Sequence, residues 1–157
     1  METFLGLSQE NVTESVQGLS RLLASTYILS LQTQNAHWNL EGRHFYMYHK
    51  FFEEHYNALA LAIDLIAERI RSLGHKVPAT LSAFEALSEI KDEPLHGKDS
   101  HFVATLLKGH ETIINLIRHI TKDLKEGEDE GTLNLLADRV EMHEKMAWML
   151  RSHLSAS

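Results

Sequence analysis

Residues 37–68 read HWNLEGRHFYMYHKFFEEHYNALALAIDLIAE, and the rest of the chain is organised around this stretch. After Gly42 it enters an apolar pattern whose members recur at alternating steps of four and three residues, as on one side of an α-helix. The members of this apolar stripe are Phe52, Tyr56, Leu59, Ile63, Ile66, Ile70 and Leu73. The sequence therefore predicts a long amphipathic helix here.

The same helix carries two pairs of polar side chains, His49 with Glu53 and Asp64 with Glu68. The members of each pair are four residues apart, so they project from one face. Because 15 residues separate His49 from Asp64, the pairs lie about 22 Å apart along the helix. Bonds from a metal to nitrogen or oxygen are only about 2 Å long, so one chain cannot close both pairs on the same ion.

A second copy of the helix removes this obstacle. If the two copies cross antiparallel on a two-fold axis near Ala58, His49 of one chain meets Asp64 and Glu68 of the other. The alanines near that midpoint would permit a close approach. The pattern therefore allows a metal site that is shared between two subunits.

The remaining sequence predicts three further long helices. They are expected over residues 11–35, 99–124 and 132–154, on apolar stripes with similar steps of three and four residues. The first stripe consists of Val12, Val16, Leu19, Leu23, Tyr27 and Leu31. The second consists of Val103, Leu106, His110, Ile113, Ile117, Ile120 and Leu124. The third consists of Leu133, Leu136, Val140, His143, Ala147, Leu150 and Leu154. Asn11 and Thr132 are the expected N-terminal caps of the first and last of them, because these side chains accept hydrogen bonds from free backbone N–H groups.

The second and third long helices are joined by a long connection. Gly74 is expected to end the helix before it, and Pro78 prevents the helix from continuing. A short helix over residues 83–89, capped by Ser82, is expected within the connection. Four long helices joined in this way predict an all-α, ferritin-like four-helix bundle with a short extra helix between helices 2 and 3.

The composition indicates one domain. The chain has 157 residues, of which 43% are hydrophobic, so residues 1–157 are expected to share one core and residues 1–8 to form a short, non-basic tail. No run approaches the roughly 20 apolar residues of a membrane span, and the N-terminus lacks the pattern of a signal peptide, so we expect a cytoplasmic protein. Cysteine is absent, which excludes a disulfide framework and a thiol nucleophile.

One spacing resembles that of a known family. The triplet HWN at residues 37–39 is followed by His49, Asp64 and Glu68. This spacing resembles the signature of the Dps family, the mini-ferritins named as DNA-binding proteins from starved cells. The resemblance extends over nearly the whole chain, including HEKMAWML in the last helix. It implies a hollow dodecamer that oxidises Fe(II) between two-fold-related subunits, stores the Fe(III) mineral and protects against oxidative damage. In this family hydrogen peroxide is usually preferred to dioxygen.

Position by position, the resemblance implies that His37 and His49 of one subunit and Asp64 and Glu68 of its partner are the ferroxidase ligands. Glu53 falls where the family often has an acidic residue that assists a second, weaker iron position; an exposed glutamate without a function is the alternative. Mixed imidazole and carboxylate ligands suit Fe(II) and also stabilise the Fe(III) formed from it.

Two further expectations follow from the resemblance. Trp38 is expected beside the site, where the tryptophan of the family packs. The acidic turn of Glu128, Asp129 and Glu130 is a candidate lining for the negatively charged channel through which family members admit iron. A solvated turn is the alternative, and Asn134 stands where the family commonly has another acid.

The eleven histidines are unusual for a chain of this length. His110 and His143 lie on apolar stripes and are expected to be hydrogen-bonded core residues rather than ligands. The histidines outside these patterns are expected at the surface: His44, His55, His75, His96, His101, His119 and His153.

DNA binding is the point at which the chain departs from the family name. Members that bind DNA generally use a mobile tail rich in Lys or Arg, whereas the first basic side chain here is Arg21 and the net charge is -7. Such a surface repels phosphate at moderate salt. We therefore expect no tight DNA binding at neutral pH.

Two other classes of function stay open. A di-iron enzyme with its site inside one bundle needs Glu-x-x-His pairs on facing helices, and the only two such pairs, residues 41–44 and 93–96, fall in expected loops. The other class is a cage-forming structural or interaction protein that binds metal incidentally. Stoichiometric oxidation of iron distinguishes a ferroxidase from it.

Overall fold

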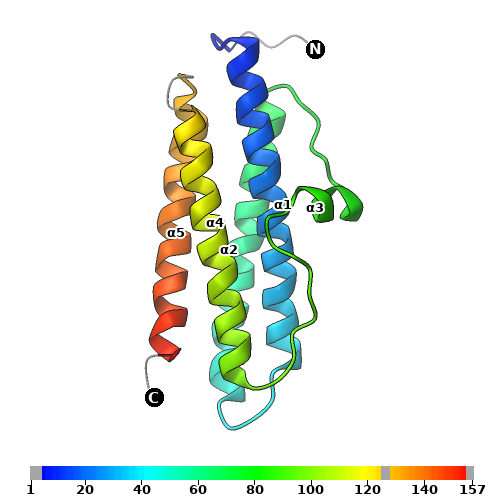
Figure 1. Cartoon of the computed structure of the whole chain (residues 1–157), viewed down its shortest axis with the longest axis vertical. Coiled ribbons are helices and arrows are strands. Elements are labelled where there is room, and N and C mark those ends of the chain that lie inside the picture. Colours follow the sequence, from blue (N-terminus) through cyan, green and yellow to red (C-terminus); the bar gives the residue numbers. More distant parts are fainter. Residues whose placement is uncertain (1–4, 125–127, 155–157) are drawn as a thin grey trace.

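The computed structural model describes residues 5–124 and 128–154. Its helices are α1 (Gln9–Asn39), α2 (Phe45–Ser72), α3 (Leu81–Leu87), α4 (Asp99–Leu124) and α5 (Glu130–Leu154). The four long helices lie side by side as a bundle, and the short α3 lies outside it, against α1 (Figure 1). These described ranges contain no strand. The expected all-α bundle, with a short extra helix in its second connection, is confirmed.

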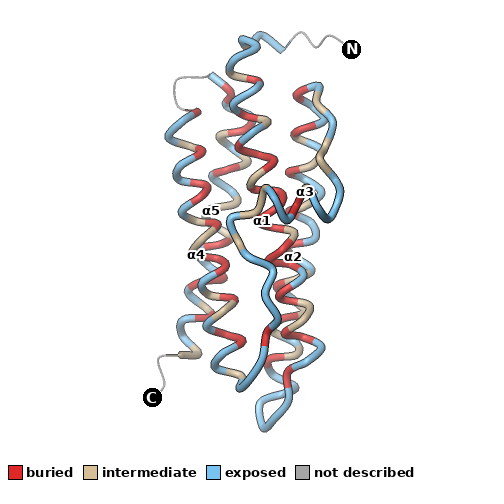
Figure 2. The backbone as a smooth tube through the Cα atoms, turned by 45° about the vertical axis from the view of Figure 1, so that its right-hand side comes forward, coloured by how far each residue is buried: buried red, intermediate tan, exposed pale blue. Residues whose placement is uncertain are grey.

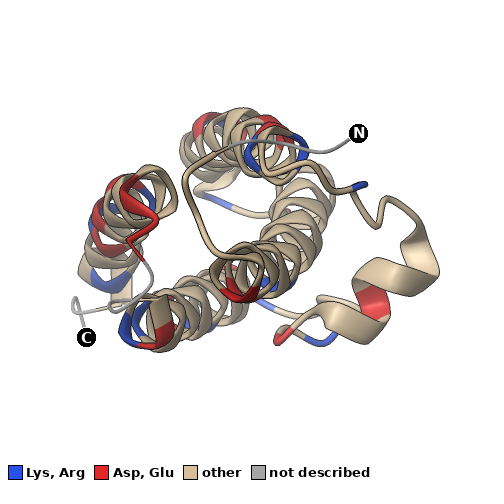
Figure 3. Ribbon diagram, turned by 90° about the horizontal axis from the view of Figure 1, so that it is seen from above, with Lys and Arg blue, Asp and Glu red and all other residues tan. Residues whose placement is uncertain are grey.

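One long crossover gives the bundle its topology. Gly74, at φ +87°, follows the end of α2 as expected. After α3 the chain runs back along the bundle, so α4 points in the same direction as α2 (Figure 1). Seen from above, the four long helices surround one core and α3 is set apart (Figure 3). Within the described residues, no helix is long and apolar enough to cross a membrane.

The apolar stripes meet inside this bundle, where the buried residues gather (Figure 2). The expected stripe of α4 is buried along its whole length: Val103, Leu106, His110, Ile113, Ile117, Ile120 and Leu124. On α1, the expected stripe member Leu31 is exposed instead. Because α2, α3 and α4 all pack on α1, its buried positions spread beyond one stripe and include Thr26 and Thr33.

The helices α1 and α3 begin two residues earlier than expected. Ser8, not Asn11, caps α1, and its hydroxyl accepts a hydrogen bond from the Asn11 N–H (3.1 Å). Thr80, not Ser82, caps α3 and accepts from the Ala83 N–H (3.2 Å). Ser, Thr and Asn are all favourable N-cap residues. Which of several neighbouring residues caps the helix therefore depends on where the backbone becomes helical.

Asp129, rather than Thr132, caps α5. Its Oδ1 accepts hydrogen bonds from the Thr132 N–H (3.0 Å) and from the Arg69 guanidinium (2.6 Å), and its Oδ2 accepts from the Ser15 hydroxyl (2.6 Å). Burial opposes ionisation, but the bonds from Ser15 and Thr132 and the charge of Arg69 together hold the pKa of this carboxyl below its usual value. The side chain thus ties α1, α2 and α5 together at one end of the bundle.

The burial of Asp129 corrects one candidate for the acidic channel. The residue is only 2% exposed, and both of its oxygens are used by bonds within the protomer. Glu128, Glu130 and Asn134 are exposed, so the channel stays a prediction for the two glutamates. Gly127, which begins the expected acidic turn GEDEG, lies outside the described residues.

The two histidines expected in the core are there. His110 and His143 are buried, and their Nδ1 atoms lie 2.9 Å apart, so one ring donates a hydrogen bond to the other. His55, expected at the surface, is buried as well, because it follows Phe52 by three residues and precedes Leu59 by four on the inner face of α2. The other histidines expected at the surface are exposed or half-buried: His44, His75, His96, His101, His119 and His153.

This buried pair predicts a loss of stability in acid. Burial lowers the pKa of His143 to about 3, with a smaller effect of Arg139, and burial together with the neighbouring histidines holds the pKa of His110 well below its usual value. In the unfolded chain both imidazoles have a pKa of about 6.5, so below that pH the unfolded state binds more protons than the folded state. We expect the free energy of unfolding to fall by about 1.4 kcal/mol per pH unit for each group. Urea titrations from neutral to mildly acidic pH, at fixed protein concentration, measure this slope.

The double variant His110→Leu/His143→Leu removes both groups and should show a shallower slope over the same pH range. His101→Leu is the matched control, because that histidine is exposed and lies outside the buried pair, and it should keep the native slope. A double variant with the slope of the native protein would show that the buried pair does not carry the effect.

Candidate functional site

The turn between α1 and α2 brings His37 and His49 together. Leu40, which is buried, follows the end of α1 and donates its N–H to a carbonyl of the last helical turn (3.1 Å). Gly42 then adopts φ +118°, which residues with a side chain rarely do. Its carbonyl accepts from the N–H of Phe45 (3.1 Å), where α2 begins. The last turn of α1 therefore lies beside the first turns of α2.

The two imidazoles hold each other through the main chain. His37 Nδ1 lies 2.8 Å from the carbonyl oxygen of His49, and His49 Nδ1 lies 2.9 Å from that of His37. Since a carbonyl oxygen only accepts, both Nδ1 atoms carry a proton and donate it. In the neutral ring the lone pair is then on Nε2, the atom that can bind a metal ion. The bonds thus select the tautomer that a metal site needs.

Ring packing fixes the orientation of this pair. The two imidazoles stack with their centroids 3.7 Å apart and their planes at 17°. Tyr56 meets His37 edge-on at 5.1 Å, and Phe45 packs on His49 at 4.9 Å. His37 is 6% exposed and His49 is half-buried. Packing against neighbouring rings thus restrains the orientation of both imidazoles.

Glu53 provides a carboxylate near the pair. It follows His49 by one helical turn, is half-buried, and accepts a hydrogen bond from Lys50 Nζ (2.8 Å). This bond and the charge of Lys50 lower the pKa of Glu53, and His37 and His49 make smaller contributions in the same direction. The carboxylate therefore lies within electrostatic reach of both imidazoles.

Asp64 and Glu68 lie on the exposed side of α2, far from the histidine pair. Fifteen residues separate His49 from Asp64, which is about 22 Å along the helix. In the part of the chain that the structure describes, no three His, Cys, Asp or Glu side chains form a group that could hold a metal ion. One protomer thus brings His37, His49 and Glu53 into one neighbourhood and leaves the other two carboxylates apart.

Three further residues lie near the pair. Trp38 directly follows His37 and is 63% exposed in the protomer, so its packing beside a site that is shared with a partner stays a prediction. Lys50 and Tyr56 have no expected role at the site. The spacing of Lys50 and Glu53, three residues apart on a helix, is the signal that indicates their contact, whereas Tyr56 carries no signal beyond its place on the apolar stripe.

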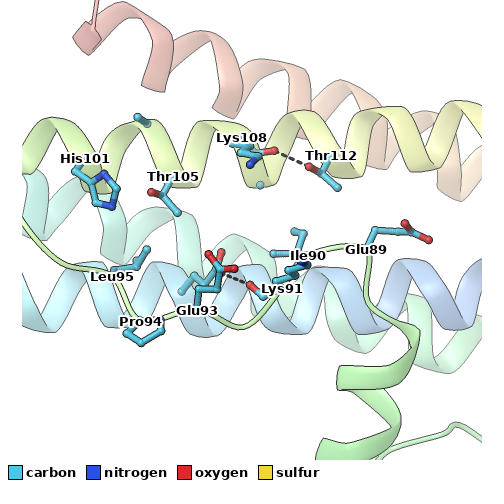
Figure 4. A pocket seen from close by; sticks show the side chains of 13 residues that line it. Glu89, Ile90, Lys91, Glu93, Pro94, Leu95, His101, Thr105, Lys108 and Thr112 are labelled. Atoms are coloured by element: carbon cyan, nitrogen blue, oxygen red, sulfur yellow. Dashed lines mark hydrogen bonds between the residues drawn. The ribbon is translucent and has the colours of Figure 1, made fainter.

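A separate groove of about 590 Å³ lies between α4 and the connection that follows α3 (Figure 4). Thr105 and Lys108 line it from α4, and Lys91 and Glu93 from the connection. Gln32 of α1 also lines it and donates its side-chain N–H to the Lys91 carbonyl (2.9 Å). None of the expected metal ligands lines this groove, so it is not part of the histidine site.

Known proteins are similar in sequence to this chain. Residues 16–156 match the family described as Ferritin-like domain. An uncharacterised low temperature-induced protein of Nostoc sp. is 36% identical over 155 residues, which cover 96% of this chain and 85% of that protein. The DNA protection during starvation protein of Helicobacter pylori is 33% identical over 147 residues, which cover 87% of this chain and 96% of the relative.

Solved structures share the fold. The Dps protein of Vibrio cholerae, described as a member of a broad superfamily of ferritin-like diiron-carboxylate proteins, matches with a TM-score of 0.92, 31% identity and 98% coverage of both chains. A Dps protein from Bacillus brevis matches with a TM-score of 0.89 and 27% identity, covering 94% of this chain and 99% of that chain. The single-crossover bundle and these matches agree with the resemblance in the helical signature, and the chain belongs to the Dps family of ferritin-like proteins.

Proposed function

We propose that this protein is a cytoplasmic mini-ferritin that oxidises Fe(II), preferentially with hydrogen peroxide, at sites shared between protomers, and stores the Fe(III) product in a dodecameric cage. Family membership supports iron storage in a homo-oligomeric cage. The observation that carries the proposal is the pair of His37 and His49, whose mutual carbonyl bonds leave both Nε2 atoms able to bind iron. Removing free Fe(II) and peroxide together protects against oxidative damage.

Each complete site takes His37 and His49 from one protomer and Asp64 and Glu68 from its partner. The separation of these groups along α2 makes a single-chain site impossible. Two α2 helices that cross antiparallel on a two-fold axis near Ala58 bring the halves together at two equivalent places. An isolated protomer is therefore inactive in this proposal.

Two exposed leucines support the crossing of α2 helices. Leu61 and Leu65 are 72% and 53% exposed and lie on the same side of α2 as Asp64 and Glu68. Fully burying a leucine stabilises an interface by about 1.5–3 kcal/mol. A second α2 packed on this side covers both leucines and carries its own histidine pair to the exposed carboxylates.

The ligand types suit the reaction. Neutral imidazole and carboxylate together bind Fe(II), and carboxylate stabilises the Fe(III) that forms. Peroxide needs two electrons and each Fe(II) supplies one, so two Fe(II) and two protons convert one peroxide into two waters. Glu53, held ionised by Lys50, serves the second iron position. Oxidising two ions together avoids the release of a hydroxyl radical.

Loss of either half of the site should abolish most of the activity. The protein is loaded with Fe(II) without oxygen, peroxide is added, and Fe(III) is followed by its absorbance. We expect His37→Ala/His49→Ala and Asp64→Ala/Glu68→Ala each to slow oxidation at least about tenfold, since even the groups that only support metal ligands often contribute that much. Dioxygen in place of peroxide should oxidise the native protein's iron more slowly.

His101→Ala/His119→Ala and Glu85→Ala/Asp92→Ala are the matched controls, because they remove exposed histidines and carboxylates outside the site. Both should keep the native rate. Site variants as fast as these controls would contradict the assigned ligands. A native cage that oxidises iron with neither oxidant would favour the alternative, a structural or interaction protein that binds metal incidentally.

Tight DNA binding is not part of this function. The net charge is -7 per chain, and Arg21, the first basic side chain, is paired with Glu89 at 2.6 Å. We expect no shift of duplex DNA on a native gel at neutral pH, micromolar protein and about 0.1 M salt, where exposed charges still act over about 10 Å. A shift that salt abolishes would contradict this expectation.

A further inference from the structure

A row of three histidines crosses the core of the bundle and has no part in the proposed iron site. His55 of α2, His110 of α4 and His143 of α5 are all buried. The ring centroids of His55 and His110 lie 5.8 Å apart with their planes at 85°, and those of His110 and His143 lie 5.1 Å apart. This histidine row therefore joins three of the four long helices.

The histidine row contains polar nitrogens without partners. Within the described residues, His55 Nδ1, His110 Nε2 and His143 Nε2 are buried and make no hydrogen bond. A buried polar atom without a partner is costly, and in a native structure it often indicates a place where a water molecule or an ion binds. His55 Nδ1 and His110 Nε2 belong to neighbouring rings, so these two atoms are the candidates for a shared ligand.

The hydrogen bond between His110 and His143 decides which nitrogen of His110 is free. The two Nδ1 atoms lie 2.9 Å apart, so one of them donates to the other. When His110 donates, its Nε2 carries the lone pair that can bind a metal ion. Burial and the nearby charge of Arg139 lower the pKa of His143 to about 3, so at neutral pH this ring is uncharged and can be the acceptor.

We propose that His55 Nδ1 and His110 Nε2 form a two-coordinate site for a monovalent copper ion, Cu(I), with His143 as the positioning residue. Bonds from a metal to nitrogen are about 2 Å long, so an ion in line between two imidazoles keeps the ring centres about 6 Å apart. The 5.8 Å between these two rings matches that spacing. The site lies within one protomer and uses no ligand of the proposed iron site.

The number of ligands favours Cu(I) over divalent ions. Zinc sites in proteins use at least three protein ligands, and the described part of the chain holds no group of three His, Cys, Asp or Glu side chains that suits a metal ion. Cu(I), in contrast, forms stable complexes with two nitrogen ligands in line. The histidine row therefore offers what Cu(I) needs and less than zinc needs.

The charge of the ion leads to the same choice. Asp129, the one buried acid among the described residues, is already paired with Arg69 at one end of the bundle. A charge that is buried without a counter-charge is costly. A single positive charge between neutral imidazoles is therefore tolerated better than a double one.

The histidine row approaches the surface near the end of α5. Phe51 packs on His55 at 4.3 Å and on His153 at 5.0 Å, and His153 is half-buried. Of the three members of the row, His55 has the largest exposed fraction, 4%. An ion therefore enters at the side of His55, and His153 is the imidazole that it meets first.

The test measures Cu(I) binding by the intact oligomer in the absence of oxygen. The protein competes for the ion with bicinchoninate, whose coloured Cu(I) complex loses absorbance as the protein binds copper. His37→Ala/His49→Ala is the background protein, because the surface pair also offers imidazoles. We expect it to bind one Cu(I) per protomer, and X-ray absorption at the copper edge to show two nitrogen ligands at about 2 Å.

Further variants in this background separate the ligands from the positioning residue. His55→Leu and His110→Leu should each abolish Cu(I) binding. His143→Leu should weaken it about 10- to 100-fold, as the loss of a group that orients a metal ligand typically does. His143→Gln keeps an acceptor and should weaken it less. His101→Leu is the matched control, because it removes an exposed histidine, and it should bind as the background protein does.

Three results would overturn the inference: undiminished binding by folded His55→Leu or His110→Leu protein, three or more copper ligands, or no Cu(I) bound by the background protein. Circular dichroism checks the fold of each variant. If the core variants do not fold, the ligand count in the background protein decides. The proposed function is tested separately, because His110→Leu with His37 and His49 intact should oxidise Fe(II) at the native rate.

Discussion

Two hydrogen bonds from imidazole to carbonyl hold the end of α1 against the beginning of α2, and the proposed chemistry depends on them. They join His37 and His49, set both protons on Nδ1 and leave Nε2 free. Because the acceptors belong to the main chain, the arrangement depends on the path of the turn more than on any third side chain. Gly42, in a conformation that few other residues adopt, makes that path short enough.

The straightness of α2 imposes the second constraint. It keeps the histidine pair and the two distant carboxylates apart, so in the proposed function one protomer is incomplete and assembly has to precede activity. Separate contacts hold the C-terminal half of α2. Arg69, the residue after Glu68, pairs with the buried Asp129 at the start of α5, and Asp129 also accepts a hydrogen bond from Ser15 of α1. This network holds the carboxylate end of α2 in place within the bundle.

Much of this arrangement can be read from the sequence, because it depends on local periodicity. The alternating apolar steps predict the four long helices, and the spacing of His49 and Asp64 shows that one chain cannot close the site. His55 is also readable in this way, since its steps to Phe52 and Leu59 place it inside, but considered singly it was expected at the surface. The helix caps are harder to predict because several neighbouring side chains can cap equally well.

Contacts between distant parts of the chain are what the sequence does not reveal. The acidic turn around Asp129 looks like a solvated loop, and its partners Arg69 and Ser15 are 60 and 114 residues away in the chain. The contact of Tyr56 with His37 likewise depends on how α1 and α2 pack. Such pairs are fixed by tertiary packing, which no local pattern encodes.

The shared site is tested most directly by mixing two inactive proteins. His37→Ala/His49→Ala and Asp64→Ala/Glu68→Ala subunits are dissociated, mixed and reassembled, and the oxidation of Fe(II) by peroxide is measured. A mixed dimer contains one intact set of ligands, so part of the native activity should return, whereas each variant reassembled alone stays inactive. Mixed oligomers that are confirmed to form but remain inactive, beside an active native protein, would contradict a site shared between two protomers.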